Sequence, residues 1–427
     1  MQNLSVDEAL GLVLEEIKPL PLEEVPLVMA LDRIIGEAVC SPVNLPLFSN
    51  SAMDGYALKA VDTAAASAIF PAKLAVIGEV AAGEVFSGKL ERGQAIRIMT
   101  GAALPEGADA VVKFEDTDEA FKPGSRAWNS VEIFTAAQPG QNVRLEGEDF
   151  KPGQPVLPTG TVLNPGCLGL VASLGYASVK CVRKPRVAIL ATGSELLQAG
   201  QPPLPGKIYN SNNYILAALV TKYGGEVVRL STVQDRTELI EQGIAESLAQ
   251  KPDLLITSGG VSVGDFDLVK QVLGTVGELQ MWQVRMRPGK PVAFGEIAGI
   301  PLLGLPGNPL AALVSFELFG KAALLKMLQC PPGPELIEAI TVEPVRNSSG
   351  RRNFLRGKLF QEEGRLYVRP SRYQMPSQLA SLVESDCLIV AGEDCSYYLA
   401  GDKVAVMPLY RLEKSLSRAI HPVMAGI

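Results

Sequence analysis

The segment 253–270 contains residue types that could bind an anion such as a phosphate. Its apolar run 254–256 predicts a buried strand, and the glycine-rich stretch 258–260 follows directly. A helix is expected from about residue 266 to residue 273. A strand, a glycine loop and a helix in this order present backbone N–H groups to an anion.

Acidic and amide side chains follow several predicted strands at the point where each strand ends. Asp265 and Asp267 would repel a bare phosphate, so we expect a cation or a basic side chain between these acids and the anion. The apolar runs 187–190, 226–230 and 301–305 lead into similar polar clusters. Because ligands bind at the carboxyl edge of open parallel sheets, these loops predict one ligand-binding rim. Its polar residues are Glu195, Asp235, Asp265, Asp267 and Asn308.

Length and composition indicate a globular protein of several domains. The chain has 427 residues, more than one hydrophobic core usually supports, so we expect about two to four domains. Apolar residues make up 47% and charged residues 20%, which excludes a disordered chain. The net charge of −7 gives no basic footprint for nucleic acid. Prolines and Glu317 interrupt the apolar stretch 300–327, so it predicts a buried strand, loop and helix rather than a membrane span.

The histidine and cysteine content excludes several kinds of site. The only histidine is His421, which excludes a triad with a histidine base and a zinc site built on histidines. The six cysteines form no C-x-x-C pair. Because a histidine base is excluded, proton transfer must rest on carboxylates, lysine, tyrosine or water. The N-terminal residues show no secretory signal.

The succession of expected elements divides the chain into four domains. Alternating strands and helices over 183–329 predict a doubly wound α/β domain. Short apolar alternations separated by glycine turns predict a β-rich module at 49–144, and short strands return in a C-terminal β domain at 334–410. The β-rich module is expected to be inserted into a domain made of residues 1–48 and 145–182.

Helical spacing and capping signals predict helices between these strands. Ser5 and Glu8 form a capping-box pattern that opens a helix reaching about residue 17. Further helices are expected over 24–39, 166–173, 212–223 and 238–250.

Seven segments, in this order along the chain, resemble the MoeA family of molybdopterin molybdenumtransferases, which is related to the E domain of gephyrin. They are NSAMDGYAL (50–58), IRIMTGAALPEGADAVV (96–112), QNVRLEGEDF (141–150), TGSEL (192–196), TSGGVSVGDFD (257–267), RPGKP (287–291) and GLPGNP (304–309). SAMDGYA, SGGVSVG and LPGNP together are highly specific for this family. The resemblance covers nearly the whole chain, and the last domain matches only loosely.

This resemblance implies a fold and a reaction. The fold is multidomain, α/β plus β, with a MogA-like α/β domain third and a β-barrel-like domain last, in an elongated homodimer. The reaction inserts molybdate into the dithiolene of adenylated molybdopterin, uses a divalent cation such as Mg²⁺ and releases AMP. The implied active cleft lies between the third domain of one subunit and the second domain of the other.

The resemblance also implies a cellular setting. A member of this family is expected to be a cytoplasmic enzyme whose substrate comes from a MogA-like adenylyltransferase. Its product goes to apo-molybdoenzymes or their chaperones. Neither a nucleic acid nor a membrane is an expected partner.

The resemblance assigns roles to individual residues. Those expected to act in catalysis are Asp54, Thr100, Asp149, Glu195, Asp235 and Asp267. The first three belong to the second domain and would act across the dimer. The others, Glu195, Asp235 and Asp267, are hard oxygen donors suited to Mg²⁺ and are the expected metal ligands.

The expected substrate-binding residues suit a polyanionic substrate, because arginine and lysine bind oxyanions. They are Arg144, Ser258, Gly259, Gly260, Ser262, Gly264, Lys270, Arg287, Lys290, Pro306, Asn308, Pro309 and Ser377. The chain departs from the family pattern at Gln283, where some members carry a basic residue.

Some of these residues also have ordinary structural explanations. Asp54 before Gly55 fits a turn aspartate, and Asp235 fits a helix N-cap. Glu195 fits a first-turn glutamate of a helix, and Asn308 between two prolines fits a residue that fixes loop geometry.

Two other functions are compatible with parts of the chain. A MogA-like adenylyltransferase would use the same α/β domain, but it would leave Asp54, Thr100 and Asp149 without a role. A scaffold like the gephyrin E domain would bind a receptor peptide. The presence of Glu195, Asp235 and Asp267 favours catalysis over that role.

Overall fold

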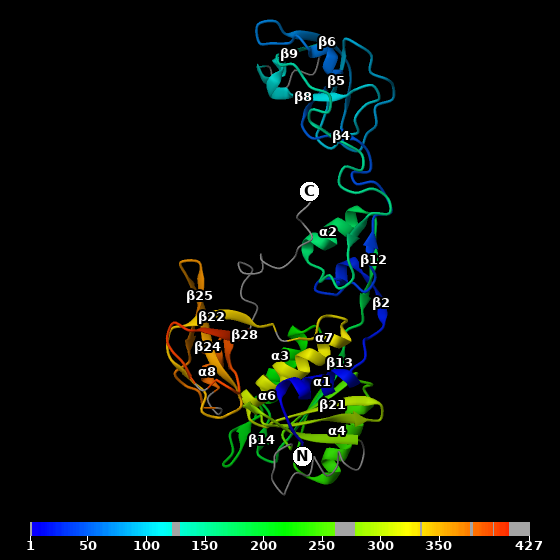
Figure 1. Cartoon of the computed structure of the whole chain (residues 1–427). Coiled ribbons are helices and arrows are strands. Elements are labelled where there is room, and N and C mark those ends of the chain that lie inside the picture. Colours follow the sequence, from blue (N-terminus) through cyan, green and yellow to red (C-terminus); the bar gives the residue numbers. More distant parts are fainter. Residues whose placement is uncertain are drawn as a thin grey trace. The chain divides into compact units, whose positions relative to one another are not determined.

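The computed structural model describes residues 2–121, 129–260, 278–333, 335–375, 379–395 and 397–409. The chain divides into two compact units (Figure 1). Glu24–Cys181 forms the insert unit, and Met1–Glu23 together with Val182–Ile427 forms the main unit. Within the described ranges, no helix has the length and apolar character needed to span a bilayer.

The main unit is built on a seven-stranded mixed sheet. In spatial order its strands are β1 (Gln2–Leu4), β18 (Glu278–Val284), β20 (Pro291–Ile297), β21 (Ile300–Leu305), β17 (Leu254–Ser258), β13 (Arg186–Thr192) and β16 (Glu226–Val233). Strands β21, β17, β13 and β16 are parallel, whereas β20 is antiparallel to both of its neighbours. All of β17 is buried, as expected for a parallel strand covered on both faces.

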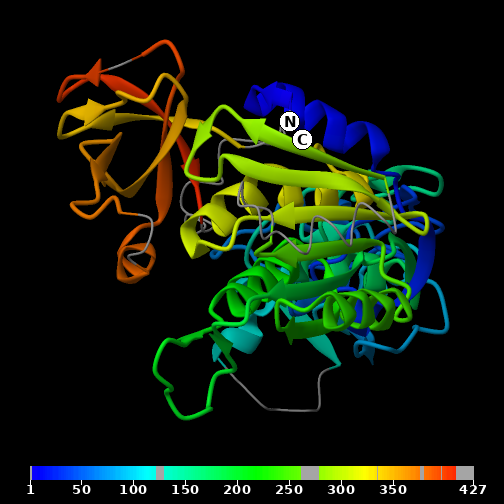
Figure 2. The ribbon, with the colours of Figure 1, turned by 90° about the horizontal axis from the view of Figure 1, so that it is seen from below.

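Helices cover both faces of this sheet, which confirms the expected doubly wound α/β fold. On one face α4 (Thr237–Leu248) packs through Ile240 and Ile244. The other face is covered by α1 (Val6–Glu16), α3 (Asn212–Lys222), α6 (Pro309–Ser315), the π-helical turn Phe316–Gly320 and α7 (Lys321–Met327). In Figure 2 the blue helix α1 lies beside the strands of this sheet.

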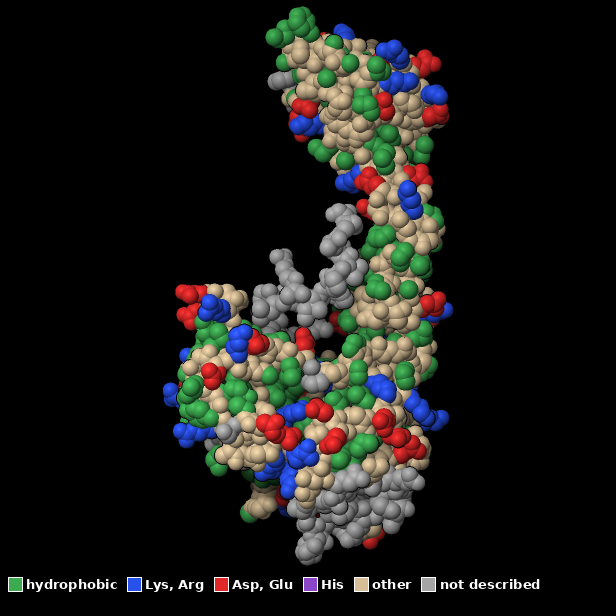
Figure 3. Space-filling model, viewed as in Figure 1, with side chains coloured by type: hydrophobic (Ala, Val, Ile, Leu, Met, Phe, Trp, Pro, Cys, Tyr) green, Lys and Arg blue, Asp and Glu red, His purple; other side chains and the backbone are tan. Residues whose placement is uncertain are grey.

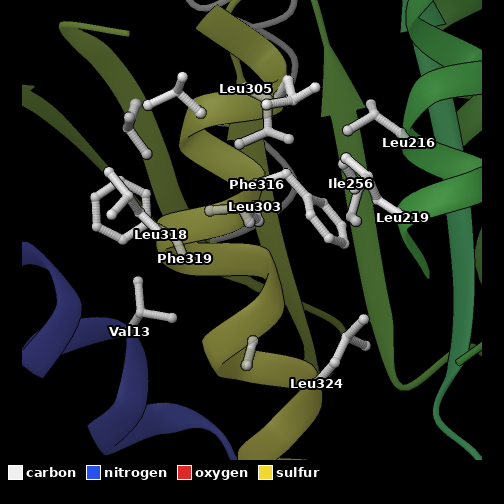
Figure 4. Packing of buried hydrophobic residues seen from close by; sticks show 14 of the residues in the cluster. Val13, Leu216, Leu219, Ile256, Leu303, Leu305, Phe316, Leu318, Phe319 and Leu324 are labelled. Atoms are coloured by element: carbon white, nitrogen blue, oxygen red, sulfur yellow. The ribbon is translucent and has the colours of Figure 1, made fainter. Parts of the chain in front are cut away.

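The largest core of the main unit lies between the sheet and the second group of helices. Figure 4 shows Leu216 of α3, Ile256 of β17 and Phe316 of the π-helical turn packed against one another. The apolar stretch 300–327 is thus a buried strand, loop and helix, as predicted. The capping box of α1 is also confirmed, because the Ser5 hydroxyl accepts the Glu8 N–H and Glu8 Oε2 accepts the Ser5 N–H.

The C-terminal part of the main unit contains a closed β-barrel, which confirms the expected barrel-like domain. Its strands are β24 (Arg352–Glu362), β25 (Arg365–Pro370), β22 (Ile337–Thr341), β28 (Lys403–Pro408) and β26 (Cys387–Ala391). The barrel closes because β24 pairs with β25 on one side and with β26 on the other. Attached elements are β19 (Met286–Arg287), β23 (Val345–Arg346), α8 (Ala380–Glu384) and β27 (Tyr397–Tyr398).

The insert unit contains a β-rich module and a smaller core of its own. The module is a five-stranded sheet with strands in the order β8 (Ala110–Lys113), β5 (Gly55–Leu58), β7 (Gln94–Ile98), β6 (Ala72–Val80) and β9 (Ser130–Ile133). Its other strands and its α-helix, including the strands with which the chain enters and leaves the unit, are β2 (Leu22–Pro26), β3 (Val39–Cys40), β4 (Asn50–Ser51), β10 (Val143–Arg144), β11 (Pro155–Leu157), α2 (Pro165–Ser173) and β12 (Ser178–Val182).

The helix expected over 24–39 is wrong. The chain there forms the end of β2, the 3₁₀ turn Leu27–Met29 and the start of β3. Pro26 favours an extended backbone at the residue before it, which opposes a helix. Ile34 and Ile35 make β-bridges to segments far away in the sequence, so their apolar character reflects strand pairing rather than a helical face.

Candidate active site

Four loops of the main unit meet at one edge of its sheet, which we call the rim. The register pairs Thr192 with Val233, Ala191 with Ser258, and Ser258 with Leu305. The carboxyl ends of β16, β13, β17 and β21 therefore lie side by side. The polar residues at or just beyond these ends include Glu195, Asp235, Ser258 and Asn308.

Two rim loops are joined by reciprocal hydrogen bonds. The Ser194 N–H donates to Asp235 Oδ2 over 2.9 Å, and the Asp235 N–H donates to Ser194 Oγ over 3.1 Å. Asp235 is not the N-cap of α4, because Arg236 occupies that position without a side-chain cap. One carboxylate oxygen of Asp235 is thus bonded to the backbone, and Oδ1 accepts no hydrogen bond from the described residues.

Glu195 lies in a closed loop rather than in the first turn of a helix. After Thr192 the chain forms β14 (Leu196–Leu197), which pairs with β15 (Ile208–Tyr209), and no helix begins before Asn212. The Glu195 carboxylate folds back over Gly193: a Cβ added there would lie 2.7 Å from Oε2. The ammonium group of Lys207 donates to the Ser194 carbonyl over 2.5 Å, which adds a cation to this acidic loop.

The glycine loop after β17 is packed too tightly for larger residues. Gly259 and Gly260 have φ of 91° and 69°, values that favour glycine. A Cβ at Gly259 would lie 2.5 Å from the Thr192 carbonyl oxygen, and a Cβ at Gly307 would lie 3.5 Å from the Gly259 Cα. The loops after β13, β17 and β21 are therefore in direct backbone contact.

Asn308 is the N-cap of α6. Its side-chain oxygen accepts from the N–H of Leu310 and Ala311 over 3.2 and 3.5 Å. Pro309 has no N–H to offer. The first N–H groups of α6 are thus either missing or occupied by the cap, so Asn308 first of all fixes the loop between Pro306 and Pro309.

Several expected site residues lie outside the described residues, as does the helix expected over 266–273. They are Ser262, Gly264, Asp265, Asp267, Lys270 and Ser377.

The RPGKP segment supplies two exposed cations beside α6. Arg287 and Lys290 flank Gly289, whose φ is 97°. A Cβ at Gly289 would lie 2.7 Å from Ser315 Oγ, so this turn packs directly onto α6. Within the described residues neither cation makes a salt bridge. Gln283 is half-buried in β18, which is paired on both sides.

In the insert unit, Asp54 and Thr100 form a compact hydrogen-bonded pair. Asp54 Oδ1 accepts from the Thr100 N–H over 2.6 Å and from the Thr100 hydroxyl over 2.8 Å. These bonds, the backbone one first, lower the pKa of the Asp54 carboxyl below its ordinary value. Asp54 is therefore a stable carboxylate at neutral pH and a weak proton acceptor.

Arg144 and Asp149 lie on chain segments that run past this pair. Arg144 pairs with Asn50 in the β10–β4 ladder, and Ser51 exchanges backbone hydrogen bonds with the turn that follows Thr100. Asp149 donates its N–H to Leu45 O further along the same two segments. Both side chains are exposed.

The described residues contain no group of three Asp, Glu, His or Cys side chains arranged to hold a metal ion. Glu195 and Asp235 are the two described members of the expected metal set, and Asp267 is outside the described ranges. The donor chemistry of these two residues fits a hard cation such as Mg²⁺, because both are carboxylates with oxygen atoms not bonded to described residues.

Three residues with specific roles in the structure escaped the sequence reasoning: Lys207, Asn212 and Arg356. Asn212 bridges two rim loops, and its only sequence signal was a polar residue at the start of a helical pattern. Arg356 is fully buried in the barrel, and burial lowers its pKa. It bonds Ser381 and the Met375 carbonyl, and so anchors the segment that leads towards Ser377.

Comparison with known proteins gives full-length matches. Three family models cover the chain: MoeA N-terminal region (domain I and II) at 4–175, a probable molybdopterin binding domain at 188–326, and MoeA C-terminal region (domain IV) at 338–409. A molybdopterin molybdenumtransferase from Haemophilus influenzae is 37% identical over 96% of this chain and 99% of its own length. One from Bacillus subtilis is 36% identical over 95% and 94%. The crystal structure of a molybdopterin biosynthesis MoeA protein from Pyrococcus horikoshii matches with a TM-score of 0.78 and 32% identity, covering 95% of this chain and 99% of that one.

Proposed function

Because this chain belongs to the MoeA family, we propose that it inserts molybdate into adenylated molybdopterin and releases AMP. Family membership makes it an enzyme of molybdenum cofactor biosynthesis, a molybdopterin molybdenumtransferase. The observation that carries the proposed reaction is the rim. Two carboxylates and a glycine loop lie there at one edge of the α/β sheet, and the RPGKP cations lie beside α6.

The chain's own residues suggest how the polyanionic substrate is held. The cap formed by Asn308 leaves few free N–H groups at the start of α6, so that helix end is a poor anion site. Arg287 and Lys290 are exposed and make no salt bridge to described residues, so they are available for phosphate and molybdate oxygens. On the face seen in Figure 3, the coloured basic and acidic side chains are interspersed and form no broad basic field.

Glu195 and Asp235, with Asp267, would hold Mg²⁺ in this proposal. The cation would neutralise the phosphoanhydride and polarise it for attack by water. The bonds between Ser194 and Asp235 fix the spacing of two loops that carry the acids, so the ligands are positioned before the cation binds.

We further propose a cytoplasmic homodimer in which Asp54, Thr100 and Asp149 of one subunit complete the site of the other. The Thr100 bonds keep Asp54 ionised, which suits electrostatic positioning better than proton removal. A MogA-like adenylyltransferase would supply the substrate, and apo-molybdoenzymes or their chaperones would take the product. The four domain boundaries expected from the sequence stay a proposal as well.

The deciding experiment incubates the purified protein with adenylated molybdopterin, Mg²⁺ and molybdate. Release of AMP together with transferable active cofactor is expected. A protein that binds the substrate but releases no AMP across a magnesium titration would refute the proposal. Mixing Asp54→Ala and Asp267→Ala subunits tests the shared site, because heterodimers with one intact site should recover activity.

A further inference from the structure

Asn212 ties together two of the rim loops from the first turn of α3. Its side-chain nitrogen Nδ2 donates to Ser258 Oγ over 2.7 Å and to the Gly307 carbonyl over 2.8 Å. Ser258 ends β17, just before the glycine loop, and Gly307 lies in the loop that follows β21. The Asn212 residue is 8% exposed, so water does not compete freely for these bonds.

The orientation of the Asn212 amide is determined by its partners. A backbone carbonyl can only accept a hydrogen bond, so the atom facing Gly307 must be the nitrogen. Both N–H groups of Asn212 are therefore used, one on each loop. Its oxygen Oδ1 is buried and accepts no hydrogen bond from the described residues.

The two loops joined by Asn212 are in contact where the ligand is expected. Gly259 donates its N–H to the Leu305 carbonyl over 3.1 Å. A Cβ at Gly307 would touch the Gly259 Cα. The two loops are far apart along the chain, so non-covalent contacts set the distance between them. A side chain that is hydrogen-bonded to both loops is well placed to control this distance.

We infer that Asn212 is a positioning residue of the active site. It holds the glycine loop at a fixed distance from the Pro306–Asn308 loop and so shapes the surface that receives the substrate. This inference rests on the proposed function, because it concerns the substrate-binding rim of that reaction. The residue acts through the backbone of the two loops and need not touch the reacting atoms.

The neighbouring Asn213 provides a matched control. It is 6% exposed, and its Nδ2 also makes two hydrogen bonds, to the Ser231 carbonyl and to Thr232 Oγ1. Its Oδ1 is likewise without a partner among the described residues. Those bonds reach Ser231 and Thr232, near the carboxyl end of β16, and not the glycine loop or the loop after β21, so the two asparagines differ mainly in what they join.

The experiment compares Asn212→Ala with Asn213→Ala in the full-length protein. We expect both variants to lower the melting temperature to a similar extent, because each loses two buried hydrogen bonds. Only Asn212→Ala should weaken binding of adenylated molybdopterin, by about ten- to a hundred-fold, since displacing positioning groups by ~1 Å can cost ~10²-fold. Hydrogen exchange at 257–260 and 304–308 should speed up in that variant alone.

The outcomes separate the inference from the function on which it rests. A parent protein that neither binds adenylated molybdopterin nor releases AMP would refute the proposed function. A fully active parent, with equal substrate binding in the two alanine variants, would overturn the role of Asn212 alone. If alanine at either position prevents folding, the serine pair Asn212→Ser and Asn213→Ser gives the same comparison with smaller cavities. Equal binding in that pair likewise counts against the inference.

Discussion

The N-cap of α6 offers a way to separate structure from ligand binding at the rim. Asn308 caps the helix that continues through the π-helical turn into α7, and most of this helix is buried against the main core. Replacing an N-cap asparagine by alanine costs about 0.5–2 kcal/mol. The two cap bonds, at 3.2 and 3.5 Å, are long, so we expect Asn308→Ala to cost about 0.5–1 kcal/mol, in the lower part of that range. That corresponds to a fall in melting temperature of about 1–4 °C for a unit of this size.

Asn308→Asp tests the other half of the same reasoning. Aspartate caps as well as asparagine, and its negative charge is favourable at a helix N-terminus, so stability should match or exceed that of the parent. The same charge would stand at the start of α6, the helix on which the turn carrying Arg287 and Lys290 packs, and would repel the anions that these two cations are proposed to bind. Binding of adenylated molybdopterin should therefore weaken several-fold, and the loss should shrink in high salt.

Calorimetry and equilibrium binding on the parent, Asn308→Ala and Asn308→Asp check both the helix cap and the effect of the added charge. An unchanged melting temperature in Asn308→Ala would contradict the cap as a source of stability. Parent-like binding by a stable Asn308→Asp protein at low salt would contradict the proposal that the substrate's anionic groups are bound close to the start of α6. The two measurements are independent, because one reports on the helix and the other on the charge.

Three other substitutions test separate parts of the structure. Thr100→Val removes the hydroxyl bond to Asp54 but keeps the backbone bond, so the pKa of Asp54 should rise towards its usual value. AMP release should fall about tenfold, as for one bond to a charged group at the weaker end of its range. Glu317→Ala removes a completely buried carboxylate whose two oxygens share the hydroxyl hydrogen of Tyr223 and which forms an ion pair with Lys222, and should cost about 3–5 kcal/mol in urea unfolding. Asp7→Asn removes the bidentate partner of Arg352, so its melting temperature should fall below that of the parent at pH 7.

The pH dependence of the last substitution follows from the direction of the shift. The hydrogen bonds from Arg352 lower the pKa of Asp7 in the folded protein. The stability from this group is therefore present above the unfolded pKa and is lost as the pH falls through the folded one. The difference between parent and Asp7→Asn should keep its pH 7 value while the pH stays well above the unfolded aspartate pKa of about 3.9, and should shrink as the pH falls below that value and through the folded pKa. A difference that stays constant would contradict the ion pair.

Thr100→Val and Glu317→Ala each have a matched control substitution. Thr161→Val deletes an exposed hydroxyl bonded only to the Pro158 carbonyl and should leave AMP release unchanged. Glu238→Ala breaks an exposed ion pair with Arg236 at 3.9 Å and should change stability by at most about 0.5 kcal/mol. Equal losses of AMP release in Thr100→Val and Thr161→Val would contradict a role for the Thr100 hydroxyl bond. Equal losses of stability in Glu317→Ala and Glu238→Ala would contradict a large contribution from the buried carboxylate.

The rim could be expected from the sequence because its signals are local. Each strand is an apolar run, each polar cluster follows directly, and the parallel topology brings the ends together. The link between Asp54 and Thr100 is different, since 46 residues separate them. It arises because β5 and β7 pair with Gly55 opposite Ile98, a register that no local pattern reveals. Pattern alone allowed only a turn aspartate, and the resemblance to the MoeA family supplied the rest.

Where sequence reasoning failed, the missing information was tertiary. Residues 24–39 have enough apolar positions for a helix, but Ile34 and Ile35 find partners at Val162 and Cys181, across the insertion. Asn212 carried only a helix-start signal, because its two acceptors, one at the end of β17 and one in the loop after β21, follow later in the chain. Local periodicity cannot encode such partners, since they exist only once the sheet order is set.

The described residues contain no histidine, and this fact and the state of Asp54 together limit the chemistry that these residues bring to the proposed reaction. The Thr100 bonds lower the pKa of Asp54, so this carboxylate is poorly suited to remove a proton from water near neutral pH. The acids of the rim are arranged along loops that the Ser194 and Asn212 bonds hold together. The described residues would therefore accelerate the proposed reaction by positioning the substrate and by electrostatic stabilisation. That is consistent with a reaction in which a good leaving group, AMP, departs from a phosphoanhydride whose charge is neutralised by cations, rather than one that depends on a strong base.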